Sequence, residues 1–170
     1  MKTSGHLPFW VMLGACALAC IAGMVNVVGY MGFEHQGITH LTGTTTLLGE
    51  ALSGADWRAS LQLAAMILAF VLGAAVSGAI IQDVQLRLGR RYGIALALES
   101  LLLFAAAAMF KQGSLAGPLL AAGACGLQNA MATTYSGALV RTTHLSGLFT
   151  DIGIGIGHAL RRMPRQATRT

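Results

Sequence analysis

The run ASLQLAAMILAFVLGAAVSGAIIQ, residues 59–82, decides the fold, because it is long, apolar and free of charged side chains. A helix needs about 20 mainly apolar residues to cross a lipid bilayer, so this run predicts a membrane-spanning helix. Three other runs meet the same requirement and predict further spans, at about 8–31, 92–110 and 115–137. We therefore expect an all-α, polytopic transmembrane bundle with about four full spans.

The composition favours a membrane protein over a soluble one. Hydrophobic residues make up 55% of the chain and charged residues only 10%, whereas ordinary globular domains carry about 25% charged residues. A soluble domain of this size could not bury so much apolar surface. The formal net charge is +5, but the arginines cluster in the loop 83–91 and in the tail 161–170. They therefore indicate membrane topology rather than nucleic-acid binding.

Two polar segments interrupt the apolar pattern, at about 38–54 and 142–158. If both dip into the membrane and return to the same side, the loop 83–91, the basic tail and Lys2 share one face, as the positive-inside rule requires. If both span, the loop and the tail fall on opposite faces. The charge distribution therefore favours two short re-entrant or broken helices, with both termini in the cytoplasm.

The two polar segments carry copies of one motif, because T-H-L-T-G begins at Thr39 and T-H-L-S-G begins at Thr143. The preceding apolar helices also match at a constant offset, in three pairs: Gly14 with Gly117, Gly23 with Gly126, and Asn26 with Asn129. The sequence thus predicts one membrane domain, 1–160, followed by a basic cytoplasmic tail, 161–170. Its internal repeat has a first unit at about 8–82 and an incomplete second unit at about 115–158.

The repeat has consequences for architecture. Under the re-entrant interpretation an odd number of spans separates equivalent points, so the second unit is inverted relative to the first. Inverted repeats occur in many secondary transporters, which bind their solutes near the bilayer midplane at broken helices. If the polar segments span, the repeats are parallel instead. The second unit ends where an equivalent of the span 59–82 would begin, so we expect it to lack one element.

Three stretches resemble the YoaK-like family of bacterial membrane proteins (domain of unknown function 1275). They are NVVGYMGF at 26–33, THLTGTTTLLG at 39–49 and GLQNAMATTYSGALVRTTHLSGLFTDIGIGIG at 126–157. The resemblance covers roughly residues 14–160. It implies a multi-pass protein of the bacterial inner membrane and no established substrate or reaction. Typical members carry a further C-terminal helix, so the resemblance implies a C-terminally short member.

The repeated motif supplies the first part of a candidate binding site. Thr39 or Thr42 could cap the short helix that follows, and Gly43 would let another backbone approach closely. The second copy offers the equivalent residues Thr143, Ser146 and Gly147. If these helix starts lie at the midplane, their positive dipole ends favour an anionic or polar group. Alternatively, Thr, Ser and Gly serve only to pack the helices together.

Five further polar residues complete the candidate site. His40 and His144 could face one another across a pseudo-twofold axis and relay protons, or each could donate to a backbone carbonyl. Asn26 and Asn129 are expected to face the bundle interior, either in interhelical hydrogen bonds or as solute lining. Glu99 lies well inside its span, where it could accept a coupling proton or pair with a histidine or arginine.

Two overlapping pairs of small residues lie in the run 59–82, namely Gly73 with Ser77 and Ala74 with Gly78. Small residues at this spacing permit close contact between helices. The contact could be made within one chain or between copies in a homo-oligomer.

The sequence predicts a transporter or channel for small solutes or ions rather than an enzyme. No nucleophile–base pair, metal-ligand spacing or phosphate-binding loop is visible, so no cofactor and no metal are expected. The alternatives are a non-catalytic accessory subunit that needs a partner helix and, less favoured, a membrane-embedded enzyme. The expected partners are the lipid bilayer, a small polar or anionic solute, and a second copy or a partner helix. Nucleic acid is not among them.

Overall fold

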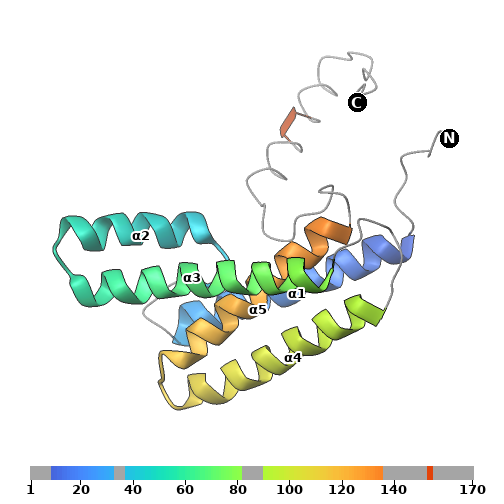
Figure 1. Ribbon diagram of the computed structural model, residues 1–170. Coiled ribbons are helices and arrows are strands. Elements are labelled where there is room, and N and C mark those ends of the chain that lie inside the picture. Colours follow the sequence, from blue (N-terminus) through green and yellow to red (C-terminus); the bar gives the residue numbers. More distant parts are fainter. Residues whose placement is uncertain (1–8, 33–36, 82–89, 136–152, 155–170) are drawn as a thin grey trace.

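The computed structural model describes residues 9–32, 37–81, 90–135 and 153–154 (Figure 1). These residues form five helices and, within the described ranges, no strand. The helices are α1 (Phe9–Gly32), α2 (Leu41–Ser53), α3 (Trp57–Ile80), α4 (Arg90–Lys111) and α5 (Ala116–Tyr135). The all-α class is confirmed, and each of the five helices lies close to a segment that the sequence predicts.

Three of the helices are long and apolar enough to cross a membrane: Met12–Gly32 within α1, and Trp57–Ile80 and Arg90–Lys111, which are the whole of α3 and α4. Many of their large apolar side chains point outward, and Phe104, for example, is 77% exposed. Such a surface is unfavourable in water and suited to lipid.

The fourth predicted span is the helix α5, but it is not among the helices apolar enough to cross a membrane alone. The physical reason is its position, since α5 contacts α1, α3 and α4 and occupies the centre of the described structure (Figure 1). Its middle, from Ala124 to Gln128, is buried throughout. A helix covered by other helices presents little surface to lipid, so its Gln and Asn side chains can lie away from lipid.

The helices α3 and α5 touch through their backbones. A methyl group added at Gly73 would overlap the carbonyl oxygen of Gly123, and one added at Gly126 would overlap the carbonyl oxygen of Phe70. Glycine is therefore required at Gly73 and Gly126 because the neighbouring backbone occupies the space of a side chain. Of the two predicted small-residue pairs, Gly73 and Ser77 are buried within the chain, whereas Gly78 has open space around it. The intramolecular interpretation is confirmed for Gly73.

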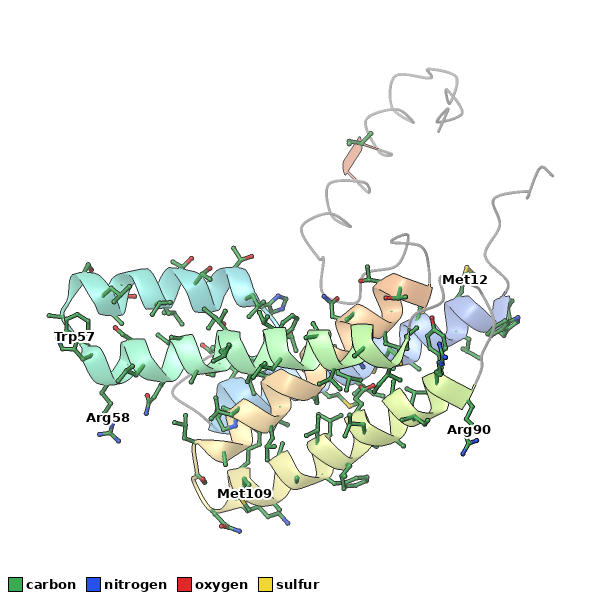
Figure 2. All side chains as sticks on the ribbon, in the orientation of Figure 1. Met12, Trp57, Arg58, Arg90 and Met109 are labelled. Carbon is green, nitrogen blue, oxygen red and sulfur yellow. The ribbon has the colours of Figure 1, made fainter. Side chains whose placement is uncertain are left out.

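Among the described helices, the short helix α2 packs mainly against α3, with which it forms a hairpin at one end of the molecule (Figure 1). The turn between them contains Ala55, whose φ is 56°, and Asp56, whose carboxylate accepts a hydrogen bond from the backbone N–H of Ala59 at 3.0 Å. This bond caps the first turn of α3. Figure 2 shows Trp57 and Arg58 at the tip of this hairpin and Arg90 at the opposite end of the molecule.

The helix directions follow from the same view. In Figure 1, α1, α2 and α4 run in one direction and α3 and α5 run in the other. The helix α2 therefore continues the direction of α1 rather than reversing it. The second polar segment, 142–158, and the tail 161–170 lie outside the described residues except for Gly153 and Ile154, so the structural equivalence of the two repeat units stays a prediction.

Candidate functional site

A short non-helical segment, residues 37–40, lies between α1 and α2 in the sequence and passes through the interior of the bundle. We call this segment the break. Ile38 is 1% exposed and Thr39 is 4% exposed, so the middle of this segment is as buried as the helix core, whereas Gly37 and His40 are half-buried. The backbone N–H of Thr39 donates to the side-chain Oδ1 of Asn26 on α1, at 3.1 Å. A buried backbone N–H without an acceptor would destabilise the fold. Asn26 supplies that acceptor and so stabilises the buried non-helical backbone at Thr39.

The same segment is also tied to α2. The hydroxyl of Thr44 lies 3.3 Å from the carbonyl oxygen of Gly37 and equally far from that of His40. A Cβ at Gly37 would lie 3.1 Å from Oδ1 of Asn26, so little room is left for a side chain there. Asn26 and Thr44 thus hold the break from both sides.

The predicted capping of α2 is wrong. The helix begins at Leu41 with His40 as its N-cap residue, and no side-chain hydrogen bond caps it. Thr42 lies inside the first turn, exposed, and its carbonyl accepts the hydroxyls of Thr45 and Thr46. The capping role fails because Ile38 and Thr39 are buried and the helix starts two residues after Thr39, which leaves His40 at the N-cap position.

Two other expectations concern the same helix. Gly43 is exposed, and a Cβ added there would have no described atom within 4 Å, so the predicted close approach of another backbone is not found there among the described residues. His40 is half-buried, and none of the hydrogen bonds among the described residues uses its imidazole.

A second polar group lies where α1, α4 and α5 meet. The side-chain amide of Gln128 on α5 donates to the carbonyl oxygen of Leu18 on α1, at 3.2 Å. The same side chain is hydrogen-bonded to the carboxyl group of Glu99 on α4. Gln128 is 2% exposed and Glu99 is 4% exposed. The Oε2 atom of Glu99 has no hydrogen-bond partner within the described part of the chain.

This second group lies about midway along its helices, between two apolar clusters. One cluster contains Ile38, Phe70 and Cys125. The other contains Tyr92 and Leu127 and has Leu18 packed against it. Because Ile38 of the buried break and Cys125 beside Glu99 belong to the same cluster, the two polar groups are joined through packed side chains.

The structure thus brings some of the predicted site residues together and not others. Asn26 joins Thr39, as an interior hydrogen bond would require. Glu99 pairs with Gln128, not with a histidine or arginine of the described residues. Asn129 is half-buried on α5, and its carbonyl accepts the hydroxyl of Thr133 at 2.7 Å. The remaining four predicted site residues lie outside the described residues: Thr143, His144, Ser146 and Gly147.

Sequence reasoning missed the central role of Gln128. The repeat draws attention to Asn129, which has a counterpart in Asn26, whereas Gln128 has none. The signal that could have found it is the presence of a second amide in an apolar helix, since such a side chain must find partners away from lipid. The contacts of Gly37 with Asn26 and of Thr44 with the carbonyl of Gly37 were also missed. Both depend on the path of the backbone through residues 37–40, which the sequence does not show.

The long apolar helices, their lipid-suited outer surface and the polar groups buried among them define a polytopic helical membrane protein. The chain belongs to the family described as "Protein of unknown function (DUF1275)", which matches residues 14–170. The resemblance that the sequence motifs indicate is confirmed at the level of this family. No curated protein and no solved structure matches the chain.

Proposed function

We propose that this protein is a transporter or channel for small polar or anionic solutes in the bacterial inner membrane, with its solute site at the break between α1 and α2. The observation that carries the proposal is the buried non-helical segment 37–40, held by Asn26. Non-helical backbone inside a membrane protein is tolerated only where protein or a water-filled cavity surrounds it. Transporters use such breaks to bind solutes and ions.

The depth of the break supports this proposal. Asn26 lies about 9 Å before the end of α1, at 1.5 Å per residue, so the chain leaves α1 and returns to a level inside the bundle before α2 begins. The helix α2 then runs in the same direction as α1 (Figure 1). This path is the one expected of a re-entrant element, which would not add a crossing of the membrane, so it supports the proposal.

The relation between α1 and α5 supports the inverted repeat. These two helices carry the matching Gly and Asn positions of the two units, and they run in opposite directions (Figure 1). Opposite directions are expected for the first helices of two inverted units and not for those of parallel units. The repeat would place a second motif around His144 opposite the first.

The chemistry of the first motif favours a small polar or anionic solute. The first N–H groups of α2 lack a side-chain cap, and a helix N-terminus carries a partial positive charge. His40 stands at this position with an imidazole that can donate a hydrogen bond. Together they offer hydrogen-bond donors to a polar or anionic solute, and the second nitrogen of the His40 imidazole offers an acceptor as well.

A flux measurement tests the proposal. Purified protein in liposomes would be challenged with gradients of chloride, acetate, glycine and urea, and shrinkage and re-swelling would be followed by light scattering. We expect at least one solute to equilibrate faster than in protein-free liposomes, and His40→Ala to slow it by about tenfold or more, the loss expected for about 1.4 kcal/mol of binding or barrier energy. Thr45→Ala, on the exposed side of α2, is the matched control and should leave the rate unchanged. Equal rates with and without protein for all four solutes would overturn the proposal.

Topology can be tested separately. Single cysteines at Ala55 and Gly113, which lie in the turns after α2 and α4, should both react with an impermeant thiol reagent added outside intact cells. A cysteine at Arg87, between α3 and α4 in the sequence, should react only after the membrane is opened. Native cysteines would first be replaced by alanine. Labelling of positions 55 and 87 from the same side would contradict the proposed crossings.

A second candidate function, an accessory subunit that binds a partner helix, is favoured by the surface of α1. Among the residues of α1 whose burial is described, only Ala22 and Gly29 are buried. Gly14 and Gly23 have open space around them, whereas Gly126, the repeat counterpart of Gly23, is covered by α3. A protein that shows no flux but co-purifies with a second membrane protein at a fixed ratio would support this function in place of transport.

A further inference from the structure

The helix α2 exposes more polar residues than its neighbour α3. The exposed residues of α2 include three threonines, Glu50 and Ser53. After Arg58, every exposed residue of α3 is apolar or glycine. A row of exposed polar side chains is unfavourable in contact with lipid, so the outer side of α2 requires a different neighbour.

The helix α2 lies beside an apolar part of α3. It runs along the first half of α3, between the break and the turn that contains Ala55 (Figure 1). In that half of α3, Leu61 is 71% exposed and Leu68 is 58% exposed. These leucines are suited to lipid, because α3 is long and apolar enough to cross the membrane over its whole length. The polar side of α2 is therefore at the depth of the lipid and not in a part of the protein outside it.

The residues of α2 are sorted onto two opposite sides. Thr44 is buried and Leu48 and Ala51 are half-buried, and their spacing of four and three residues places them on the side that packs against α3. Residues with the same kind of spacing lie on the opposite side and are all exposed, namely Thr42, Thr46, Gly49 and Ser53. We call these four residues the polar stripe. An apolar side against protein and a polar side opposite it are typical of a helix whose outer side meets water.

The polar stripe connects the outer end of α2 with the break. In the last turn of α2, Glu50 is an exposed carboxylate and requires water around it. At the other end, Thr42 follows two residues after His40, which is half-buried and belongs to the break. A helix of 13 residues is about 20 Å long. The stripe thus covers the whole distance from a hydrated carboxylate to the proposed solute site.

From this arrangement we infer that the polar stripe of α2 lines a water-filled access path, along which a small polar or anionic solute reaches the break from the outer face of the membrane. The outer face is the one on which the topology proposed above places Ala55. The inference rests on the proposed function for the solute, and it adds the residues that line the path and the side from which the solute enters.

The hydroxyl groups of the stripe suit an access path. The hydroxyls of Thr46 and Ser53 each donate to a carbonyl oxygen of α2 itself, at 2.9 and 2.8 Å. Their oxygens keep lone pairs that accept hydrogen bonds from water or from a solute. One hydroxyl bonded in this way can also lie on an apolar helix, as the exposed Ser100 of α4 does. The inference therefore depends on the continuity of the whole stripe and not on a single hydroxyl.

The access path can be tested by cysteine accessibility. The native cysteines would be replaced by alanine, and single cysteines would be placed at each position of the polar stripe. A Cβ at Gly49 would have no described atom within 4 Å, so a side chain fits there. A small, impermeant, anionic methanethiosulfonate reagent would be added outside intact cells. We expect all four cysteines to react about tenfold faster or more than cysteines at Leu61 and Leu68, because the reactive thiolate forms in water and not in lipid.

Two results of this measurement would overturn the inference. The first is reaction at the polar stripe that is no faster than at Leu61 and Leu68, which would mean that lipid or another protein covers the outer side of α2. The second is reaction at Ser53 alone, which would confine water to the membrane surface and leave the break without access.

Solute flux separates the access path from the proposed function. In liposomes, modification of a cysteine at Thr46 should slow a transported solute by about tenfold or more, the effect of adding about 1.4 kcal/mol to its barrier, whereas modification at Leu61 should leave the rate unchanged. Flux that continues at the same rate after modification at Thr46 would overturn the access path. If no solute crosses with the unmodified protein, the proposed function fails, and the reaction rates still decide whether water reaches the break along α2.

Discussion

Replacing Gly73 by alanine should destabilise the protein more than the same replacement at any glycine that has room for a side chain. The added methyl group would overlap the backbone carbonyl of Gly123, and a backbone atom cannot rotate away as a side chain can. The helices α3 and α5 would have to separate, which weakens the main helix contact of the bundle. Overpacking of this kind costs about 1–3 kcal/mol and occasionally more, and leucine at Gly73 should prevent folding altogether.

Gly78 provides the matched control for this prediction. It lies on the same helix, five positions further along the chain, and a Cβ there would have no described neighbour within 4 Å. Alanine has a higher helix propensity than glycine, so Gly78→Ala should leave the stability unchanged or raise it. Unfolding of purified protein by increasing SDS in mixed micelles, followed by helical circular dichroism, would compare the two. Equal midpoints for Gly73→Ala and Gly78→Ala would show that the backbone contact between α3 and α5 is absent.

Replacing Asn26 by alanine should release the buried break before α2. The N–H of Thr39 would lose its acceptor while staying buried, and an unsatisfied buried donor costs about 1–3 kcal/mol. Since each 1.4 kcal/mol corresponds to about a tenfold change, we expect hydrogen exchange at Thr39 to accelerate by about five- to a hundredfold. Mass spectrometry of peptides that cover residues 37–44 would measure it.

The neighbouring residue Val27 supplies the control for Asn26. Its side chain is exposed, so Val27→Ala should leave exchange at Thr39 unchanged. If Asn26→Ala also left it unchanged, the break would be held by Thr44 and by the burial of Ile38, and Asn26 would not be its anchor. In that case the solute site proposed at the break would lose its main support.

Much of the fold could be predicted from the sequence, because hydropathy and helix length depend on the sequence alone. The predicted spans 8–31 and 59–82 agree with α1 and α3 to within about two residues, the usual uncertainty of helix ends. The short helix α2 was predicted from a polar segment too short to span. Gly73 was also identified as a packing residue, but its partner Gly123 was not, because the contact depends on how two helices cross.

The candidate site was predicted less completely, and for physical reasons. The role of Asn26 as an interior hydrogen-bonding residue could be predicted, because an asparagine in an apolar helix must avoid lipid. Its partner, the N–H of Thr39, could not be, because a backbone group leaves no signal in the sequence. The pairing of Glu99 with Gln128 depends on the relative position of α4 and α5 along their axes, which the contact of Gly117 with Phe110 helps to set.

The position of α5 also bears on how the chain enters the membrane during synthesis. The insertion machinery admits a segment according to its own hydrophobicity, and α5 lacks the apolarity of α1, α3 and α4. Its buried amide side chain finds partners only after Leu18 and Glu99 are already in place. The central helix α5 is thus the last of the five described helices to be synthesised. It also depends most on the other helices, because they must already be in the membrane to cover its polar side chains. We therefore expect the integration of α5 to be cooperative, because α5 would leave the translocon in contact with helices that are already in the membrane.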